Sequence, residues 1–122
     1  MDLKPIPHSF SVCKVTSAAD VDLTAPFCFV GKTDEELSLV CPTQYAPAAC
    51  PEREDGWRAF RIQGVLDFSL VGILADISAT LARSGIGLFA VSTYNTDYIL
   101  VREDQFQPAL EALARAGHRI LD

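Results

Sequence analysis

The second half of the chain is predicted to contain six short segments in a fixed order, and this order restricts the fold more than any other feature of the sequence. Around Phe60, apolar and polar residues alternate as in a half-buried strand, whereas from Leu70 to Leu81 apolar residues recur every three or four positions as in an amphipathic helix. The predicted segments are strand 60–63, helix 70–81, strands 86–91 and 98–101, helix 104–116 and strand 118–121. A strand–helix–strand–strand–helix–strand order within about 60 residues is typical of the ferredoxin-like α+β fold, with an antiparallel sheet and two helices on one of its faces.

Both predicted helices are bounded by residues that favour helix ends. Asp67 or Ser69 is expected to cap the start of the first helix, and Gly85 follows it where a left-handed residue ends a helix. Asp104 is expected to cap the second helix. Pro108 is expected in its first turn, where a missing N–H costs little.

The first half is predicted to be a weaker copy of the second. Its predicted segments are strands 10–15, 27–30 and 36–40, a short helical stretch at 18–21 and a proline-rich connection at 42–51. Residues 29–40 match residues 89–101 when one residue of slip is allowed, so that Phe29 aligns with Phe89 and Leu39 with Leu100. We interpret the charged run 52–56 as a hinge and expect two related units, residues 1–58 and 59–122, because a unit of about 60 residues buries little surface alone.

Length and charge exclude several classes of protein. The 122 residues have room for one compact domain or for two very small ones that share a core. Sixteen acidic and ten basic residues give a net charge of −6, so neither nucleic acid nor an anionic membrane surface is expected as a partner. No apolar run approaches the roughly 20 residues that span a bilayer, and the N-terminus lacks a signal-peptide pattern, so a cytoplasmic location is expected.

No residue pattern predicts a catalytic, metal or cofactor site. The four cysteines never come closer than nine positions apart, which argues against zinc, and Cys13, Cys28 and Cys41 lie in apolar runs typical of buried, reduced thiols. His8 and His118 are expected at the surface. Because the sequence also lacks a phosphate-binding loop and a nucleophile motif, we expect no enzyme activity, no metal and no cofactor.

Two segments resemble the ACT domains, small regulatory modules that bind amino acids. These are residues 64–74, a loop that enters a helix, and residues 89–101, a hairpin with the turn sequence Ser-Thr-Tyr-Asn-Thr-Asp-Tyr. The resemblance is strongest to the branch found in cytosolic arginine sensors and in the regulatory part of aspartate kinases. It covers residues 58–122 well and the first half only by pattern, and it implies a βαββαβ fold with allosteric rather than catalytic use.

The resemblance implies that an amino acid binds between the loop at 66–72 and the hairpin at 92–98. In the loop, free N–H groups at the helix start suit a carboxylate, and Gly72 permits close approach. In the hairpin, Asp97 suits the ligand's ammonium group or a basic side chain. The implied ligand-binding residues are Asp67, Phe68, Ser69, Leu70, Gly72, Thr93, Tyr94, Thr96 and Asp97.

The same residues also fit a purely structural role. Asp67 and Ser69 are common helix caps, and Asn95 and Asp97 are common in turns. The first half has Lys32 where the second has Ser92, and three acidic residues at 34–36, so the pattern does not predict an equivalent site there.

The resemblance and the residue pattern together predict a non-catalytic amino-acid sensor that acts through a protein partner or its oligomeric state. Strand 98–101 carries apolar side chains on both faces, so something must cover each of them. Either the other unit or a second chain could do so, and a homodimer is expected. The alternative is a structural interaction module that has lost its ligand.

Overall fold

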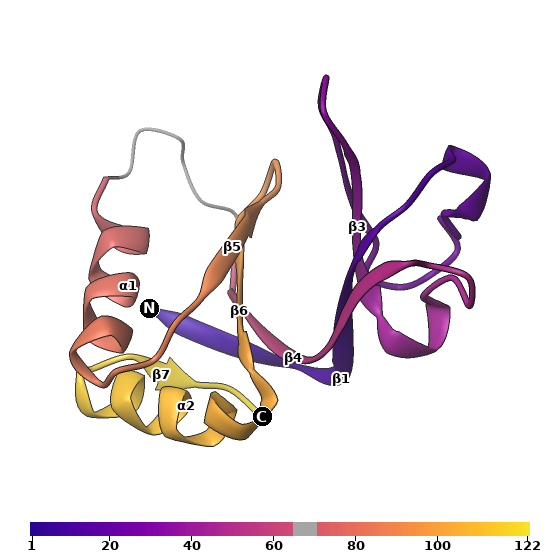
Figure 1. Ribbon diagram of the computed structural model, residues 1–122. Helices are drawn as coiled ribbons and strands as arrows, with labels where there is room; N and C mark the ends of the chain where they lie inside the picture. Colours follow the sequence, from indigo (N-terminus) through magenta and orange to yellow (C-terminus); the bar gives the residue numbers. More distant parts are fainter. Residues whose placement is uncertain (65–70) are drawn as a thin grey trace. The chain divides into compact units, whose positions relative to one another are not determined.

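The computed structural model describes residues 1–64 and 71–122, which form parts of two compact units (Figure 1). The C-terminal unit comprises Met1–Pro7 and Arg58–Asp122, and the N-terminal unit comprises His8–Trp57. Strands β1 (Asp2–Lys14) and β4 (Glu52–Ile62) each contribute residues to both units. The first seven residues thus group with the second half of the chain.

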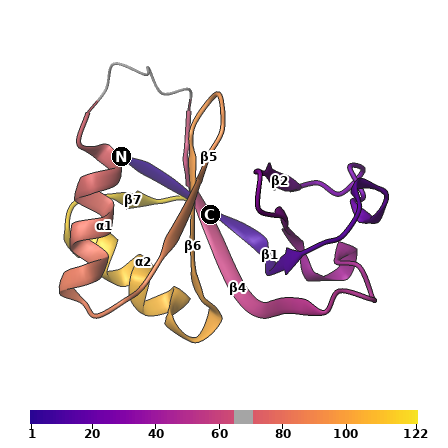
Figure 2. The same cartoon turned by 45° about the horizontal axis from the view of Figure 1, so that its top comes forward.

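The C-terminal unit contains the six predicted segments in the predicted order. They are the end of β4, α1 (Ile73–Arg83), β5 (Phe89–Ser92), β6 (Asp97–Arg102), α2 (Phe106–Arg115) and β7 (Arg119–Ile120), with the 3-10 turn η3 (Glu103–Gln105) before α2. Helices α1 and α2 lie together against one face of the sheet, as Figures 1 and 2 both show. This arrangement confirms the predicted α+β class and its ferredoxin-like order.

An additional strand, the start of β1, is inserted into this sheet. The strand order is β5-β6-β4-β1-β7, so β1 takes the place beside β4 that the last strand of an undivided βαββαβ unit would occupy. β7 pairs instead with β1, through Asp2 with Arg119 and Leu3 with Ile120, and the pairing is parallel. The all-antiparallel expectation fails at this pair because β1 and β7 both run opposite to β4.

The core of the C-terminal unit lies between its sheet and its helices. Leu3, Phe60 and Ile62 from β1 and β4 are fully buried there. The other buried members of this cluster are Ile77, Leu81, Ile86, Ile99, Val101, Phe106, Ala109, Leu110 and Leu113. Ile99, Leu100 and Val101 are all 0% exposed in the single chain, so both faces of β6 are covered without a second copy.

The helix ends differ in part from the prediction. Gly85 (φ +72°) and Gly117 (φ +103°) follow the two helices in the left-handed region, as is typical of helix C-termini. The N-cap position of α1 is Gly72 rather than Asp67 or Ser69, two residues that lie outside the described ranges. Asp104 does not cap α2, because it lies within η3 and Gln105 occupies the N-cap position.

His118 is not a surface residue, contrary to the prediction. Its side chain is only 7% exposed, and Nε2 lies 3.1 Å from the Asp76 carboxylate on α1. His8 is half-buried, with its ring centroid 5.8 Å from that of Phe27. Neither position could be inferred from distance along the chain, since both contacts join segments far apart in sequence.

The N-terminal unit has the same strand order with much shorter helices. Its elements after β1 are the 3-10 turn η1 (Ala18–Asp20), β2 (Phe29–Lys32), β3 (Leu37–Pro42), the 3-10 turn η2 (Thr43–Tyr45) and the start of β4. The order β2-β3-β1-β4 matches β5-β6-β4-β1 in the C-terminal unit. β1 and β4 therefore exchange the roles of first and last strand between the two units.

The charged run 52–56, interpreted as a hinge between the halves, belongs to strand β4, which passes from the N-terminal to the C-terminal unit between Trp57 and Arg58. In the N-terminal unit β4 is the edge strand, where charged side chains are common. Gly56 lies within it at φ +84°, a conformation typical of a β-bulge. The charged composition is thus that of an edge strand, which continues without interruption into the C-terminal unit.

The two hairpins share one register, displaced by 60 residues at every pair. Phe29 pairs with Val40 as Phe89 pairs with Leu100, and the match continues to the turn. Thr33 and Thr93 both donate their N–H across the turn, to the carbonyls of Glu36 and Thr96. The one-residue slip expected from the sequence is therefore wrong, since apolar neighbours such as Ile99 and Leu100 are interchangeable in a sequence comparison.

All four cysteines are free and belong to the N-terminal unit. Cys13 and Cys41 are buried, as predicted, with Cys28 and Cys50 half-buried beside them. Burial raises the pKa of Cys13 to about 12 and that of Cys41 to about 11. These two thiols are protonated at neutral pH and act as small apolar core groups.

Candidate functional site

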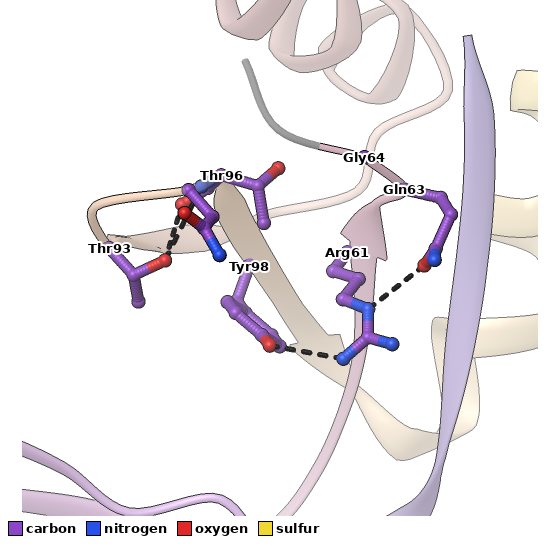
Figure 3. A pocket seen from close by; sticks show the side chains of 7 residues that line it. Arg61, Gln63, Gly64, Thr93, Thr96 and Tyr98 are labelled. Atoms are coloured by element: carbon purple, nitrogen blue, oxygen red, sulfur yellow. Dashed lines mark hydrogen bonds between the residues drawn. The ribbon is translucent and has the colours of Figure 1, made fainter.

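A pocket of about 350 Å³ lies where β4 ends beside the β5–β6 turn (Figure 3). Polar side chains and the glycine after β4 form most of its wall. The lining residues are Arg61, Gln63, Gly64, Thr93, Asn95, Thr96 and Tyr98. They come from two segments some 30 residues apart, which the sheet brings side by side.

The β5–β6 turn is held firmly against the end of β4. The Thr93 N–H and hydroxyl both donate to the Thr96 carbonyl, at 2.8 and 3.0 Å. Thr96 is buried, and its hydroxyl donates to the Ile62 carbonyl at 2.6 Å. A buried hydrogen bond of this kind is costly to break, so this side of the pocket is preformed.

Arg61 supplies the positive charge of the pocket. Its Nε donates to Gln63 Oε1 at 3.1 Å and its guanidinium donates to the Tyr98 hydroxyl at 3.2 Å, as Figure 3 shows. The guanidinium carbon lies 6.0 Å from the centroid of the Tyr98 ring. None of the lining residues is acidic, so the guanidinium is held in place without being neutralised from within the pocket wall.

This arrangement suits a ligand that carries a carboxylate. Guanidinium binds carboxylates through paired N–H groups, and Arg61 uses neutral partners that do not compete for its charge. The hydroxyl groups of Thr93 and Tyr98 and the amide of Asn95 add donors and acceptors around it. The pocket can therefore hold a small polar anion or zwitterion.

The structure brings only part of the predicted site together. Thr93 and Thr96 line the pocket, whereas Tyr94 is 81% exposed and is not among the lining residues. The Asp97 carboxylate accepts a hydrogen bond from the Ser92 hydroxyl at 2.6 Å. Because side chains alternate along β6, Asp97 lies on the face that carries Ile99 and not on that of Tyr98.

The remaining predicted residues belong to the loop before α1. Gly72 adopts φ +84°, and a Cβ there would meet no atom within 4 Å, so the backbone is open to approach. It is not a lining residue of the pocket. Asp67, Phe68, Ser69 and Leu70 lie outside the described residues.

The sequence analysis missed Arg61, Gln63 and Tyr98. In the sequence, Arg61 and Gln63 fit the polar half of an alternating strand, and Tyr98 fits an apolar strand. Their spacing contained a usable signal, because two polar residues two positions apart share one face of a strand. Which residue they meet across the sheet depends on the β4–β6 pairing, which the sequence does not specify.

Three comparisons with known proteins bear on this site. A sequence model of the ACT domain family matches residues 52–115. The human cytosolic arginine sensor for mTORC1 subunit 1 is 42% identical over 60 residues, which are 48% of this chain and 18% of the sensor, and the mouse protein is 40% identical over the same length. The chain thus matches less than a fifth of the length of these curated relatives.

Solved structures resemble a larger part of the chain. A protein from Agrobacterium tumefaciens has a TM-score of 0.87 and 32% identity, with 98% of this chain and 91% of that protein covered. The aspartate kinase of Clostridium acetobutylicum has a TM-score of 0.64 at 14% identity, with 93% of this chain and 33% of the kinase covered. The first likeness extends over both units, and the second shows a shared fold.

Proposed function

This chain belongs to the ACT domain family, a regulatory fold related to amino-acid sensors, and on that premise we propose that it binds a free amino acid in the pocket at Arg61. The observation that carries the proposal is the Arg61 guanidinium, held by Gln63 and Tyr98 at the end of β4. The ligand carboxylate pairs with this guanidinium. The hydroxyl of Thr93 and the amide of Asn95 orient the rest of the molecule.

The proposed role is regulatory and not catalytic. In the described part of the chain no three His, Cys, Asp or Glu side chains gather as a metal site would require, and no helix is long and apolar enough to cross a membrane. We propose that ligand binding changes the affinity of the chain for a protein partner, in the cytoplasm. A coupling of this kind needs only that the ligand and the partner favour the same conformation.

A second copy of the chain is the first partner to consider. β5 ends the strand order of the sheet, so its outer backbone groups have no neighbouring strand in the described residues. An edge strand of this kind pairs readily with another chain. We propose a homodimer on this ground. The apolar faces of β6 no longer require one, because Ile99, Leu100 and Val101 are buried within a single chain.

A thermal-shift screen of the twenty amino acids tests the proposed function. A ligand present at 100 times its dissociation constant stabilises the folded state by about 2.7 kcal/mol, which raises the melting temperature by several degrees. Arg61→Ala should abolish the rise. Arg115→Ala, which removes the same charge from an exposed site on α2, should retain it.

Three outcomes would count against the proposal. If the ligand still raises the melting temperature of Arg61→Ala, the ligand binds elsewhere. If Asp97→Ala abolishes the rise and Arg61→Ala does not, the result favours the site predicted from the sequence, on the Asp97 face of β6. No rise with any amino acid would favour a structural interaction module that has lost its ligand.

A further inference from the structure

The four cysteines gather in one place in the N-terminal unit, although they are far apart in the sequence. Cys13 and Cys41 are buried in one apolar cluster, and Cys28 and Cys50 pack against it. They come from β1, from β3 and from the segments just before β2 and β4. Oxidation can join two thiols only where their sulfur atoms lie nearly in contact, so the arrangement within the cluster decides which pair can react.

Cys13 and Cys50 are the pair in contact. The Cys13 thiol is hydrogen-bonded to the Cys50 thiol. The Cys50 sulfur also lies 3.1 Å from the carbonyl oxygens of Glu52 and of Lys14, the residue after Cys13. A small movement of either side chain therefore brings the two sulfurs to bonding distance.

The two sulfurs differ in their exposure to solvent. Cys13 is only 1% exposed, whereas Cys50 is half-buried. A pocket of about 600 Å³ borders the pair, with Cys13 itself and Pro51, the residue after Cys50, in its lining. A reagent from solution therefore meets Cys50 first and reaches Cys13 only through it.

Arg53 places a positive charge beside both sulfurs. Its guanidinium interacts electrostatically with Cys13 and Cys50, and its Nε donates to the Asp55 carboxylate at 2.7 Å, which holds it in place. Thiol–disulfide exchange passes negative charge from one sulfur to the next, and a fixed cation stabilises that charge. Burial, and after it the charge of Cys50, raises the pKa of Cys13 to about 12. The second of these causes disappears once Cys50 is bonded to another sulfur and carries no charge.

We propose that Cys13 and Cys50 are a modification site, at which a low-molecular-weight disulfide such as oxidised glutathione joins the two thiols in a disulfide bond. The Cys50 thiolate attacks the reagent, which breaks the reagent's sulfur–sulfur bond, forms a mixed disulfide on Cys50 and releases one thiol. The Cys13 thiolate then attacks the Cys50 sulfur and displaces the second thiol. Two electrons pass from the chain to the reagent, and the two protons of the cysteine thiols end on the two released thiols.

The new bond ties the end of β1 to the segment that enters β4. It closes residues 13–50 into a loop, which restricts the unfolded chain and so stabilises the folded N-terminal unit. The contacts of the Cys50 thiol with the two carbonyls are lost, at little cost because a thiol is a weak donor. Excess thiol reverses the reaction, so the stability of this unit follows the balance of thiols and disulfides around it. The site uses no residue of the Arg61 pocket and is independent of the function proposed above.

Mass spectrometry of the full chain after incubation with mixtures of oxidised and reduced glutathione tests the proposal. The remaining thiols are blocked with N-ethylmaleimide in urea before digestion. Trypsin leaves Cys41 and Cys50 in one peptide, residues 33–53, so chymotrypsin is added to cleave after Tyr45 and separate them. We expect the peptides that contain Cys13 and Cys50 to be joined. The melting temperature of the oxidised chain should be about 5–15 °C higher, and dithiothreitol should reverse the rise.

Variants separate the two steps. Cys13→Ser should stop the reaction at the mixed disulfide, so that glutathione remains on Cys50. Cys50→Ser should leave Cys13 a free thiol. Cys28→Ser is the matched control, because it removes a half-buried thiol from the same cluster, and it should form the same bond as the unsubstituted chain.

Three results with the unsubstituted chain would overturn the proposal, and none of them depends on the folding of a variant. They are a bond between Cys28 and Cys41, glutathione that stays on Cys50 without a bond to Cys13, and four free thiols in an excess of oxidised glutathione. A bond between Cys13 and Cys50 that leaves the melting temperature unchanged would overturn its stabilising effect. Each of these results would leave the function proposed for the Arg61 pocket standing.

Discussion

The hydrogen bond from Thr96 to Ile62 is the contact that fixes the pocket turn, and its loss should be measurable as a loss of stability. Thr96 is 7% exposed, and its hydroxyl donates to the Ile62 carbonyl at 2.6 Å. Thr96→Val keeps the volume of the side chain but removes the donor. The Ile62 carbonyl then loses this partner in a place that water reaches poorly.

The expected cost follows from that burial. Leaving a buried polar group without its partner costs about 1–3 kcal/mol, which for a chain of this length lowers the melting temperature by roughly 4–12 °C. Urea unfolding measures the free energy of unfolding directly. An unchanged m-value would show that Thr96→Val and the unsubstituted chain expose the same surface area when they unfold.

Thr93→Val is the matched control. Thr93 is in the same turn and also donates from its hydroxyl, but it is exposed, so water can replace the lost bond. We expect it to cost less than about 0.5 kcal/mol. A loss at Thr93→Val equal to that at Thr96→Val would refute the reasoning, because burial would then not be the cause.

Two further predictions concern the N-terminal unit. The hydrogen bonds from Arg53 and Ser11 lower the pKa of Asp55, so the stability it contributes is present above its ordinary pKa of 3.8 and is lost as the pH falls through the lowered value. Asp55→Asn should therefore flatten the acid limb of the stability curve measured by urea unfolding, and an unchanged limb would contradict this. Because burial raises the pKa of Cys13 and Cys41, iodoacetamide at pH 8 should modify them only in urea, as followed by mass spectrometry, and rapid labelling of the folded chain would show them to be accessible.

The local elements of the C-terminal unit were predictable from the sequence. The spacing of apolar residues from Ile73 to Leu81 indicates a helix with one buried face. Gly85 and Gly117 mark the helix ends, because glycine adopts a positive φ without strain. These signals lie within a few residues of the structure they specify, so each can be read from a short window.

Features that depend on distant pairing were not predictable. The start of β1 lies beside β4 and pairs with β7, which brings the two ends of the chain together. Nothing in the sequence near Leu3 indicates this pairing. The charged residues 52–55 form an edge strand in the N-terminal unit, although by composition they suggest a break. The pocket was missed for the same reason, since Arg61 meets Tyr98 only through the order of the strands.

A crystal structure of the chain with the amino acid that most raises its melting temperature tests the central claim most directly. We predict that the ligand carboxylate lies within hydrogen-bond distance of the Arg61 guanidinium, with the Thr93 and Tyr98 hydroxyls around it. A ligand bound instead on the opposite face of β6, beside Asp97 and Gly72, would contradict the assignment of the site.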